Sequence, residues 1–434
     1  MQLDTPTCTR TGTYLTGPVS SSFTHESVTT PPSIAVITEA PLTMSPKILQ
    51  VGVIGGGDVA QIVHLPTFML LSSLFKVVSI CDVSRKTADH CRAKFSIPHA
   101  TTNPDDIFND PAIDVVVILT SDEYHALYTI AALKAGKNVL LEKPMTLSLQ
   151  AADEIIDAET KAPNNARVFV GYMRRYAPSL RAFKREIASI DKIKYARVRD
   201  IIGPNAYFIG QSGAHPQKYH DDIPIEASED RKARLAVLLG QAWGQEPESL
   251  TAAQMDYCCL LGSLGSHGLS LMRNVLGGLP ESVLASTDNA RWYTAMFEYR
   301  NGTAPDDRFT CVYEMGIDSV PRFDSHVAVY GENKSVTICY DTPFVKGLGI
   351  TVEIDELNEH GEKSHRSLQT SYEDAYTAEL KEWYETVVHG KEVKTSAKDA
   401  RDDLRLFKMM MDKFPEHKKI KDASDSTPFV PSGP

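Results

Sequence analysis

The sequence predicts an α/β domain with a parallel sheet, followed by a C-terminal α+β domain with a mostly antiparallel open sheet. Two patterns predict this fold class. Over residues 47–172, short apolar runs alternate with helical stretches, as in a parallel sheet that is covered on both faces. Beyond them, strand-like runs follow one another with few helices between, which favours an antiparallel or mixed sheet.

Length and composition describe an ordinary globular protein. The chain has 434 residues, of which 42% are apolar and 23% are charged. Its formal net charge of -11 disfavours nucleic acid and anionic membranes as partners. Seven cysteines without a CxxC pair favour a reducing compartment, so we expect a cytoplasmic protein. No apolar run reaches the ~18–20 residues that a membrane span needs.

Both ends of the chain are predicted to lie outside the folded domains. Residues 1–46 are rich in Ser, Thr and Pro and lack the apolar block of a signal peptide, so we expect a disordered extension, with Met44 as a candidate alternative start. We expect a flexible tail over residues 419–434. The two folded domains then span residues 47–172 and 173–418.

The first domain is built from alternating strands and helices. Ser84 is a candidate N-cap for the second helix, and Gly136 is a candidate stop for the third. In chain order we expect a strand at 48–54, a helix at 58–71, a strand at 76–81, a helix at 84–95, a strand at 114–120, a helix at 122–135, a strand at 138–141, a helix at 148–160 and a strand at 167–171.

The second domain is dominated by strands. A helical block at about 226–277 interrupts them, and helices at 372–389 and 397–414 end the domain. We expect strands at 195–202, 282–287, 292–299, 309–315, 326–330, 335–339 and 350–354.

The glycine cluster after the first strand predicts a dinucleotide site. The segment Gly55-Gly56-Gly57-Asp58-Val59-Ala60 fits G-x-G-x-x-G/A, follows a strand and opens a helix, as a Rossmann domain requires. Gly55 would permit the tight turn, and Gly57 would let backbone approach the pyrophosphate. Ala60 would let helix and strand pack closely, while N–H groups at the helix start, from Asp58 and Val59 onward, would hold the phosphates.

The residue at the end of the second strand bears on the choice of cofactor. Asp82 lies about 20 residues beyond the glycine motif, where an acidic side chain binds ribose hydroxyls. An aspartate there favours NAD, because it would repel the 2′-phosphate of NADP. Arg85 and Lys86 follow closely and leave NADP open, since either would hold that phosphate.

Several segments resemble the glucose–fructose oxidoreductase / inositol dehydrogenase family, called Gfo/Idh/MocA. They are the glycine loop, the strand ending at Thr120, Tyr124-His125-Ala126, the run from Ala132 to Val139, Glu142-Lys143-Pro144 and the run from Gly171 to Tyr176. The resemblance implies an N-terminal Rossmann domain, a C-terminal open sheet that serves as a homodimer or homotetramer interface, and a nicotinamide cofactor. It also places Thr120, His125, Glu142, Lys143 and Arg174 at the cofactor.

Lys143 is the candidate catalytic acid/base. It follows a parallel strand, at the sheet edge where such folds bind ligands. Transfer of a hydride to or from a hydroxyl carbon requires a proton to move at the same time, and a lysine whose pKa burial lowers is suited to that task. His64 and His125 also match family positions, and we interpret both as orienting or packing groups.

The family's second-domain motif is only partly present. His267 matches the family histidine and is the candidate assisting proton group, but Ser263 and Ser270 stand where many members have aspartates. Without an acidic partner, the basicity of His267 should be low. Candidate substrate residues, besides Ser263, lie in a polar block that starts at the end of the strand at 195–202 and continues into a loop: Asp200, Asn205, Tyr207 and His220. No spacing of ligands supports a metal site.

The resemblance implies an NAD(P)-dependent oxidoreductase acting on a small hydroxyl or carbonyl compound, such as a sugar, a polyol or a specialised metabolite. Two alternatives stay open. The first is a catalytically weakened regulator that senses a dinucleotide, which the absence of the two carboxylates favours. The second is an NAD-assisted hydrolase or lyase. The presence of Lys143 and His267 favours the oxidoreductase.

Overall fold

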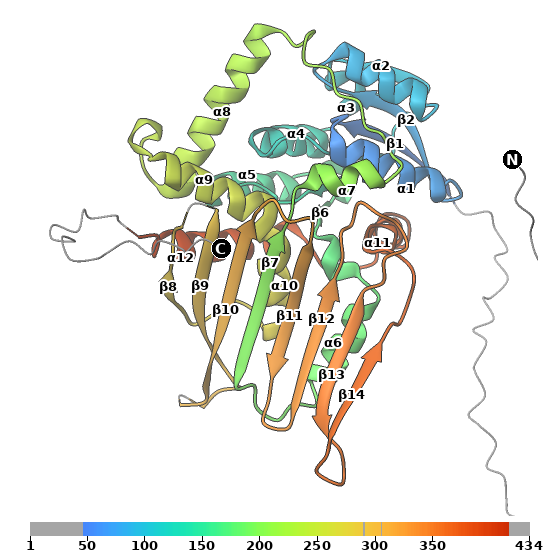
Figure 1. Cartoon of the computed structure of the whole chain (residues 1–434). Coiled ribbons are helices and arrows are strands. Elements are labelled where there is room, and N and C mark those ends of the chain that lie inside the picture. The colour runs from blue at the N-terminus through green and yellow to red at the C-terminus, as the bar shows by residue number, and fades with distance from the viewer. Residues whose placement is uncertain (1–46, 290, 305, 416–434) are drawn as a thin grey trace, which may run out of the picture. The chain divides into compact units, whose positions relative to one another are not determined.

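A computed structural model of the chain describes residues 47–289, 291–304 and 306–415 (Figure 1). The predictions of a disordered extension over residues 1–46 and of a tail over residues 419–434 concern segments outside the described residues.

The first sheet is parallel throughout. Its six strands lie in the order β3-β2-β1-β4-β5-β6, so the direction of winding reverses between β1 and β4. The residues of β4 are all buried, as expected of a strand covered on both faces. The strands are β1 (Leu49–Ile54), β2 (Phe75–Cys81), β3 (His99–Thr101), β4 (Val115–Ile118), β5 (Asn138–Glu142) and β6 (Val168–Gly171). Strand β3 was not among the predicted elements, because it is short and partly exposed.

Helices connect these strands. The side chain of Ser84 accepts a hydrogen bond from the backbone N–H of Thr87 and caps α2, as predicted. The helix after the glycine loop includes a π-helical turn, η1 (Ala60–His64), before α1. The helices are α1 (Leu65–Leu70), α2 (Arg85–Lys94), α3 (Asp105–Phe108), α4 (Asp122–Lys134) and α5 (Leu149–Thr160), with a 3₁₀ turn, η2 (Pro163–Asn165), before β6.

The second sheet is mixed. The strand order is β14-β13-β12-β11-β7-β10-β9-β8. Strand β7 pairs parallel with β10, whereas all other neighbouring strands of this sheet pair antiparallel. The strands are β7 (Tyr195–Ile202), β8 (Ser282–Ser286), β9 (Trp292–Arg300), β10 (Arg308–Ile317), β11 (Phe323–Tyr330), β12 (Lys334–Tyr340), β13 (Thr351–Leu357) and β14 (Lys363–Leu368). Edge strand β14 was not among the predicted strands, because its sequence is polar and has no apolar face.

Helices α6 and α10 pack on one face of this sheet, against β12–β13 and against β7 and β11 respectively (Figure 1). The helical elements are η3 (Met173–Tyr176), α6 (Ser179–Ile187), α7 (Asn205–Gln211), α8 (Ile225–Trp243), η4 (Pro247–Ser249), α9 (Ala252–Leu260), η5 (Leu261–Gly265, a π-helical turn), α10 (Ser266–Leu276), α11 (Ala375–His389) and α12 (Ala397–Met411). Within the described ranges, these helices include none with the length and apolar character of a membrane span.

Helix α11, the second-last helix of the described residues, returns to the first sheet. The ring of Trp383 stacks on that of Phe75 in β2, with 5.7 Å between the ring centroids and 13° between the planes. Leu380 and Tyr384 belong to the same buried cluster as Leu49 of β1. The core of the parallel sheet therefore includes side chains from the last part of the described chain.

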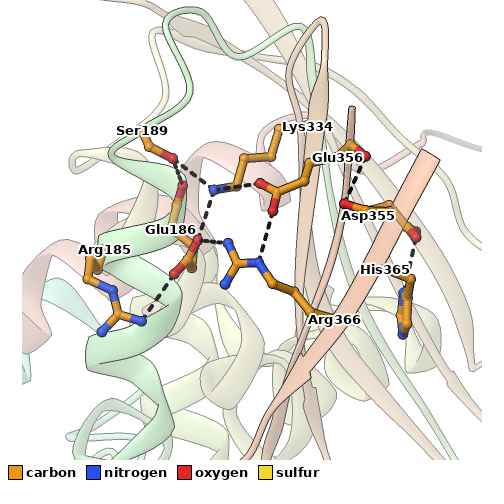
Figure 2. A network of polar contacts seen from close by, with 9 residues as sticks. Arg185, Glu186, Ser189, Lys334, Asp355, Glu356, His365 and Arg366 are labelled. Carbon is orange, nitrogen blue, oxygen red and sulfur yellow. Dashed lines mark hydrogen bonds and ion pairs between the residues drawn. The ribbon is translucent and has the colours of Figure 1, made fainter. Parts of the chain in front are cut away.

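A network of ion pairs fixes α6 to the edge of the second sheet (Figure 2). The Glu186 carboxylate lies 2.8 Å from the Lys334 ammonium and 2.6 Å from the Arg366 guanidinium. Arg366 also pairs with Glu356 at 2.9 Å. Hydrogen bonds from Arg366, Lys334 and Arg185 lower the pKa of Glu186 to about 2, against the opposing effect of its partial burial. Three elements are thus joined through one carboxylate.

Candidate functional site

The glycine loop lies between β1 and the helix that begins at Asp58. Gly55 has a φ of 104°, and a Cβ there would lie 2.6 Å from the carbonyl oxygen of Leu119. Only glycine fits this turn without strain. Around Gly57, in contrast, no other heavy atom of the described chain lies within 4 Å of the position of a Cβ. Ala60 is buried where the helix packs on the sheet, and Asp58 and Val59 are partly exposed.

A cavity of about 430 Å³ opens at the carboxyl ends of β1, β2 and β4. This is the edge at which the winding of a doubly wound sheet reverses and where such sheets bind ligands. The hydroxyl of Thr120 is buried there without a hydrogen-bond partner among the described residues. Open space beside Gly57 and an unpartnered Thr120 hydroxyl fit a dinucleotide. Residues lining the cavity include Gly55, Gly57, Asp82, Thr120, Tyr124, Ile223 and Ala227.

Asp82 is held at the end of β2 by two backbone N–H groups. Gly56 donates to its Oδ2 at 2.8 Å, and Ser84 donates to its Oδ1 at 2.9 Å. Burial raises the pKa of Asp82, and the charge of Asp222 adds to that effect, whereas the two N–H donors oppose it. Arg85, expected at the cofactor, is exposed and pairs with Asp89 at 2.8 Å. That ion pair directs the guanidinium along α2, and the expected contact of Arg85 with the cofactor stays a prediction.

Lys143 lies just beyond β5 and reaches the second domain. Its Nζ donates a hydrogen bond of 2.8 Å to the carbonyl oxygen of Ser263 in η5. Burial lowers the pKa of Lys143, and the charge of Arg174 acts in the same direction, whereas the charges of Glu142 and Asp122 oppose both. A lysine with a lowered pKa can exchange a proton nearer to neutral pH.

Glu142 is fixed by a histidine from the first helix. Its Oε1 lies 2.7 Å from Nε2 of His64, and its Oε2 accepts from the N–H of Lys143 at 3.0 Å. Burial alone would raise the pKa of Glu142, but the hydrogen bond to His64 and the charges of His64 and Lys143 hold it below its ordinary value. Glu142 therefore carries negative charge next to Lys143.

His125 joins two strand ends. Its Nδ1 lies 2.7 Å from the carbonyl oxygen of Pro144, and its Nε2 lies 3.0 Å from that of Thr120. Its side chain is buried. These contacts give it an orienting position between β4 and the turn after β5.

His267 lies at the start of α10, in the electrostatic field of Lys143 and Arg174. Burial, together with these two positive charges, lowers its pKa well below the ordinary value. Its Nδ1 is buried without a hydrogen-bond partner among the described residues. The side chain of Ser263 is exposed, and the hydrogen bond between Ser263 and Lys143 is made by the Ser263 backbone carbonyl. The imidazole of His267 is therefore neutral in this arrangement.

Two expected site residues form a buried ion pair with each other. Asp200 is fully buried in β7, and its Oδ1 accepts from Arg174 at 2.6 Å and from Ser325 at 2.8 Å. Tyr313 donates to its Oδ2 at 3.3 Å. Asp200 was expected to contact substrate and Arg174 the cofactor. In the structure the carboxylate and one guanidinium nitrogen are bound to one another below the surface, and the expected contacts with substrate and cofactor stay predictions.

The remaining candidates lie on a helix and a connection rather than on one loop over Lys143. Asn205 and Tyr207 are exposed on α7, which replaces the expected loop. His220 lies in the connection from α7 to α8, where its charge lowers the pKa of Asp82. It therefore lies near the cofactor edge, and its contact with substrate stays a prediction.

Sequence reasoning missed two acidic residues. Asp122, at the start of α4, acts on Lys143 through its charge, and its Oδ2 lies 3.3 Å from the position of a Cβ at Gly262. Its place directly after β4, at the same sheet edge, was an available signal. Asp222 contacts the start of α2 from the connection to α8. No local pattern marks it, since the contact spans two domains.

Comparison with known proteins agrees with this geometry. Residues 49–172 match the Gfo/Idh/MocA family, an oxidoreductase family with an NAD-binding Rossmann fold. Inositol 2-dehydrogenase of Paracoccus denitrificans is 31% identical over 149 residues, which are 33% of this chain and 42% of that protein. The chain thus aligns with about two fifths of the length of this relative.

Solved structures show the likeness over both sheets. A levoglucosan dehydrogenase in complex with NADH and levoglucosan gives a TM-score of 0.63 at 17% identity, over 85% of this chain and 97% of that one. KijD10, a 3-ketoreductase from Actinomadura kijaniata in complex with NADP and TDP-benzene, gives 0.62 at 16% identity, over 85% and 98%. At this identity the likeness concerns the fold. Residues 49–172 of this chain are thus similar to the NAD-binding Rossmann domain of the Gfo/Idh/MocA oxidoreductase family.

Proposed function

We propose that this protein is an NAD-dependent oxidoreductase that interconverts a hydroxyl and a carbonyl group on a small molecule, such as a sugar, a polyol or a specialised metabolite. The observation that carries the proposal is Lys143, whose pKa burial lowers, held at the sheet edge beside the cofactor cavity. The resemblance also supports a homodimer or homotetramer, and the cysteine content supports a cytoplasmic location.

The residues that would hold the cofactor are those of the cavity. Gly55, Gly57 and the N–H groups from Asp58 to Ala60 suit the pyrophosphate, and Asp82 suits the ribose hydroxyls. When bound, nicotinamide supplies or accepts a hydride. Asp82 favours NAD because a second negative group beside it would be repelled.

Lys143 would polarise the substrate oxygen and exchange its proton. In the direction of oxidation its neutral amine accepts the hydroxyl proton, and in the direction of reduction its ammonium donates that proton. The charge of Glu142 stabilises the ammonium form of Lys143 and so opposes the lowering of its pKa by burial. His267, which is neutral at physiological pH, can donate or accept one hydrogen bond to substrate.

The test is a comparison of Lys143→Ala, Lys143→Arg and, as a matched control, Lys134→Ala at an exposed position of α4. NADH binding is followed by fluorescence and turnover of hydroxyl and carbonyl compounds by absorbance at 340 nm. We expect both Lys143 variants to bind NADH while kcat falls by roughly 10²–10⁴-fold, and the control to match wild type.

Other outcomes identify the alternatives. Binding of NADH without turnover of any substrate would favour a dinucleotide-sensing regulator, which the serines at positions 263 and 270 support. A reaction that requires NAD but leaves the absorbance at 340 nm unchanged would favour a hydrolase or lyase. Failure to bind either dinucleotide would overturn the proposal.

A further inference from the structure

The connection between α7 and α8 crosses the cofactor edge of the first domain. We call residues 212–224 the strap. In Figure 1 it runs alongside α2, and its contacts are specific. The side chain of Gln61 donates to the carbonyl of Gln217 at 2.7 Å and accepts from its N–H at 2.9 Å. Lys218 lies 2.6 Å from the carboxylate of Asp58. The strap is therefore fixed to the helix that follows the glycine loop.

Further along, the strap contributes a carboxylate to the start of α2. Oδ1 of Asp222 accepts from the hydroxyl of Ser84 at 2.6 Å, and Oδ2 accepts from the N–H of Lys86 at 2.9 Å. The oxygen of Ser84 itself accepts from the N–H of Thr87 at 3.0 Å, so its own proton is free for Asp222. These two hydrogen bonds lower the pKa of Asp222, which is thus an anion. The carboxylate of Asp222 therefore lies at the N-terminus of the ten-residue helix α2, which Ser84 caps and where a negative charge is stabilised.

This anion lies beside the residue that is expected to bind ribose. Ser84 donates its N–H to Asp82 and its hydroxyl to Asp222, so one residue bridges the two carboxylates. In a dinucleotide-binding domain, the 2′-hydroxyl lies at the acidic residue after the second strand, and in NADP that oxygen carries the phosphate. The position of the Asp222 carboxylate is therefore the one that a 2′-phosphate would need.

The neighbouring basic side chains are also paired with acids of the chain. Lys86 lies 2.5 Å from Asp221 of the strap, and Arg85 pairs with Asp89. An incoming 2′-phosphate would have to displace Asp222 and would meet the charges of Asp82 and Asp221. Both effects disfavour NADP.

We propose that Asp222 is a specificity-determining residue, which selects NAD over NADP by filling the 2′-phosphate position with a carboxylate of the protein. The proposal rests on the proposed function, because it requires the cavity to bind a dinucleotide. It assigns to the strap the task of excluding one cofactor, in addition to the contribution of Asp82.

The experiment measures the competition of 2′,5′-ADP and of 5′-ADP with NADH by fluorescence, so the readout needs no substrate. The proteins are wild type, Asp222→Asn, Asp222→Ala and the control Glu226→Gln, which neutralises an exposed carboxylate at the start of α8. We expect the affinity for 2′,5′-ADP relative to 5′-ADP to rise on the order of tenfold in both Asp222 variants. We expect no change in Glu226→Gln.

A second substitution tests whether the 2′-phosphate that binds in the Asp222 variants uses the hydrogen-bond donors that hold the Asp222 carboxylate in wild type. Ser84→Ala, added to Asp222→Ala, should remove most of the gain, because it deletes the hydroxyl that now holds the carboxylate. If NADH binds but the ratio of the two affinities stays as in wild type, or if the gain persists without the Ser84 hydroxyl, the specificity proposal is overturned and the proposed function stands. If none of the proteins binds NADH or 5′-ADP, both are overturned.

Discussion

The ammonium nitrogen of Lys143 lies 2.8 Å from the carbonyl oxygen of Ser263. This hydrogen bond connects the end of β5 with a π-helical turn that is far away in the sequence. A carbonyl dipole stabilises an ammonium less than a carboxylate would, so the charge of Lys143 depends on more distant acids, namely Glu142 and Asp122. Two acids of the first domain therefore oppose the effects of burial and of Arg174 on the proton affinity of the proposed catalytic group.

Asp122→Asn should shift the pH dependence of the reaction. The charge of Asp122 raises the pKa of Lys143, so its removal lowers that pKa further. Oxidation requires the neutral amine, and the rise of kcat/KM with pH should therefore move to lower pH. Reduction requires the ammonium, and its activity should be lost at lower pH than in wild type. Profiles in both directions check this, with the exposed Asp153→Asn as control. An unchanged profile would refute the coupling.

Gly55→Ala and Gly57→Ala should separate stability from cofactor binding. At Gly55 the positive φ and the 2.6 Å approach to Leu119 should cost roughly 1–3 kcal/mol of unfolding free energy. At Gly57 a methyl group meets only open space, so stability should change by less than about 0.5 kcal/mol. Binding of NADH should weaken in Gly57→Ala because the methyl group occupies the approach to the pyrophosphate. Denaturant titrations and NADH fluorescence measure the two effects; normal NADH affinity in Gly57→Ala would contradict the proposed role.

Most of the parallel sheet was predictable because its strands other than β3, and its longer helices, carry their signal within about ten residues. The apolar run of β4, the cap Ser84 and the stop Gly136 all act locally. The same holds for Lys143, whose position follows from the strand before it. Asp200 could not be placed in this way. Its ion pair with Arg174 and its burial depend on strands that come much later in the chain.

Arg174→Ala should destabilise the protein by about 3–5 kcal/mol, because it leaves the carboxylate of Asp200 buried without its partner. Arg199→Ala is the matched control. Arg199 is partly exposed and pairs with Glu314 and Asp324, so its loss should cost about 1 kcal/mol or less. Urea denaturation of both variants gives the comparison. Equal losses would show that the Arg174 pair contributes no more than a surface pair.

Glu186→Gln should reduce the loss of stability in acid. The pKa of Glu186 is about 2 in the folded protein, below the value of 4.5 for a free glutamate. Its contribution is therefore complete above about pH 4.5 and is lost as the pH falls towards 2. Wild type should be more stable than the variant at pH 6, and the difference should shrink towards pH 3. Denaturant titrations at several pH values measure this, with the exposed Glu332→Gln as control. A difference that is independent of pH would contradict the assignment.

The strap marks a second limit of local reasoning. Arg85 and Lys86 are basic residues close to Asp82, and their sequence position is equally consistent with a phosphate site. Only the folded chain shows that Asp89 and Asp221 neutralise them and that Asp222 bonds to Ser84. The contacts of the strap join residues more than a hundred positions apart, which no periodicity can reveal.

The stacking of Trp383 on Phe75 has a consequence for how the protein is made. All strands of the parallel sheet have left the ribosome soon after Gly171, yet the apolar surface around Phe75 stays uncovered until α11 has been synthesised. This domain is thus completed only after most of the second described domain has been synthesised. A fragment ending at residue 172 would expose that surface, which favours aggregation.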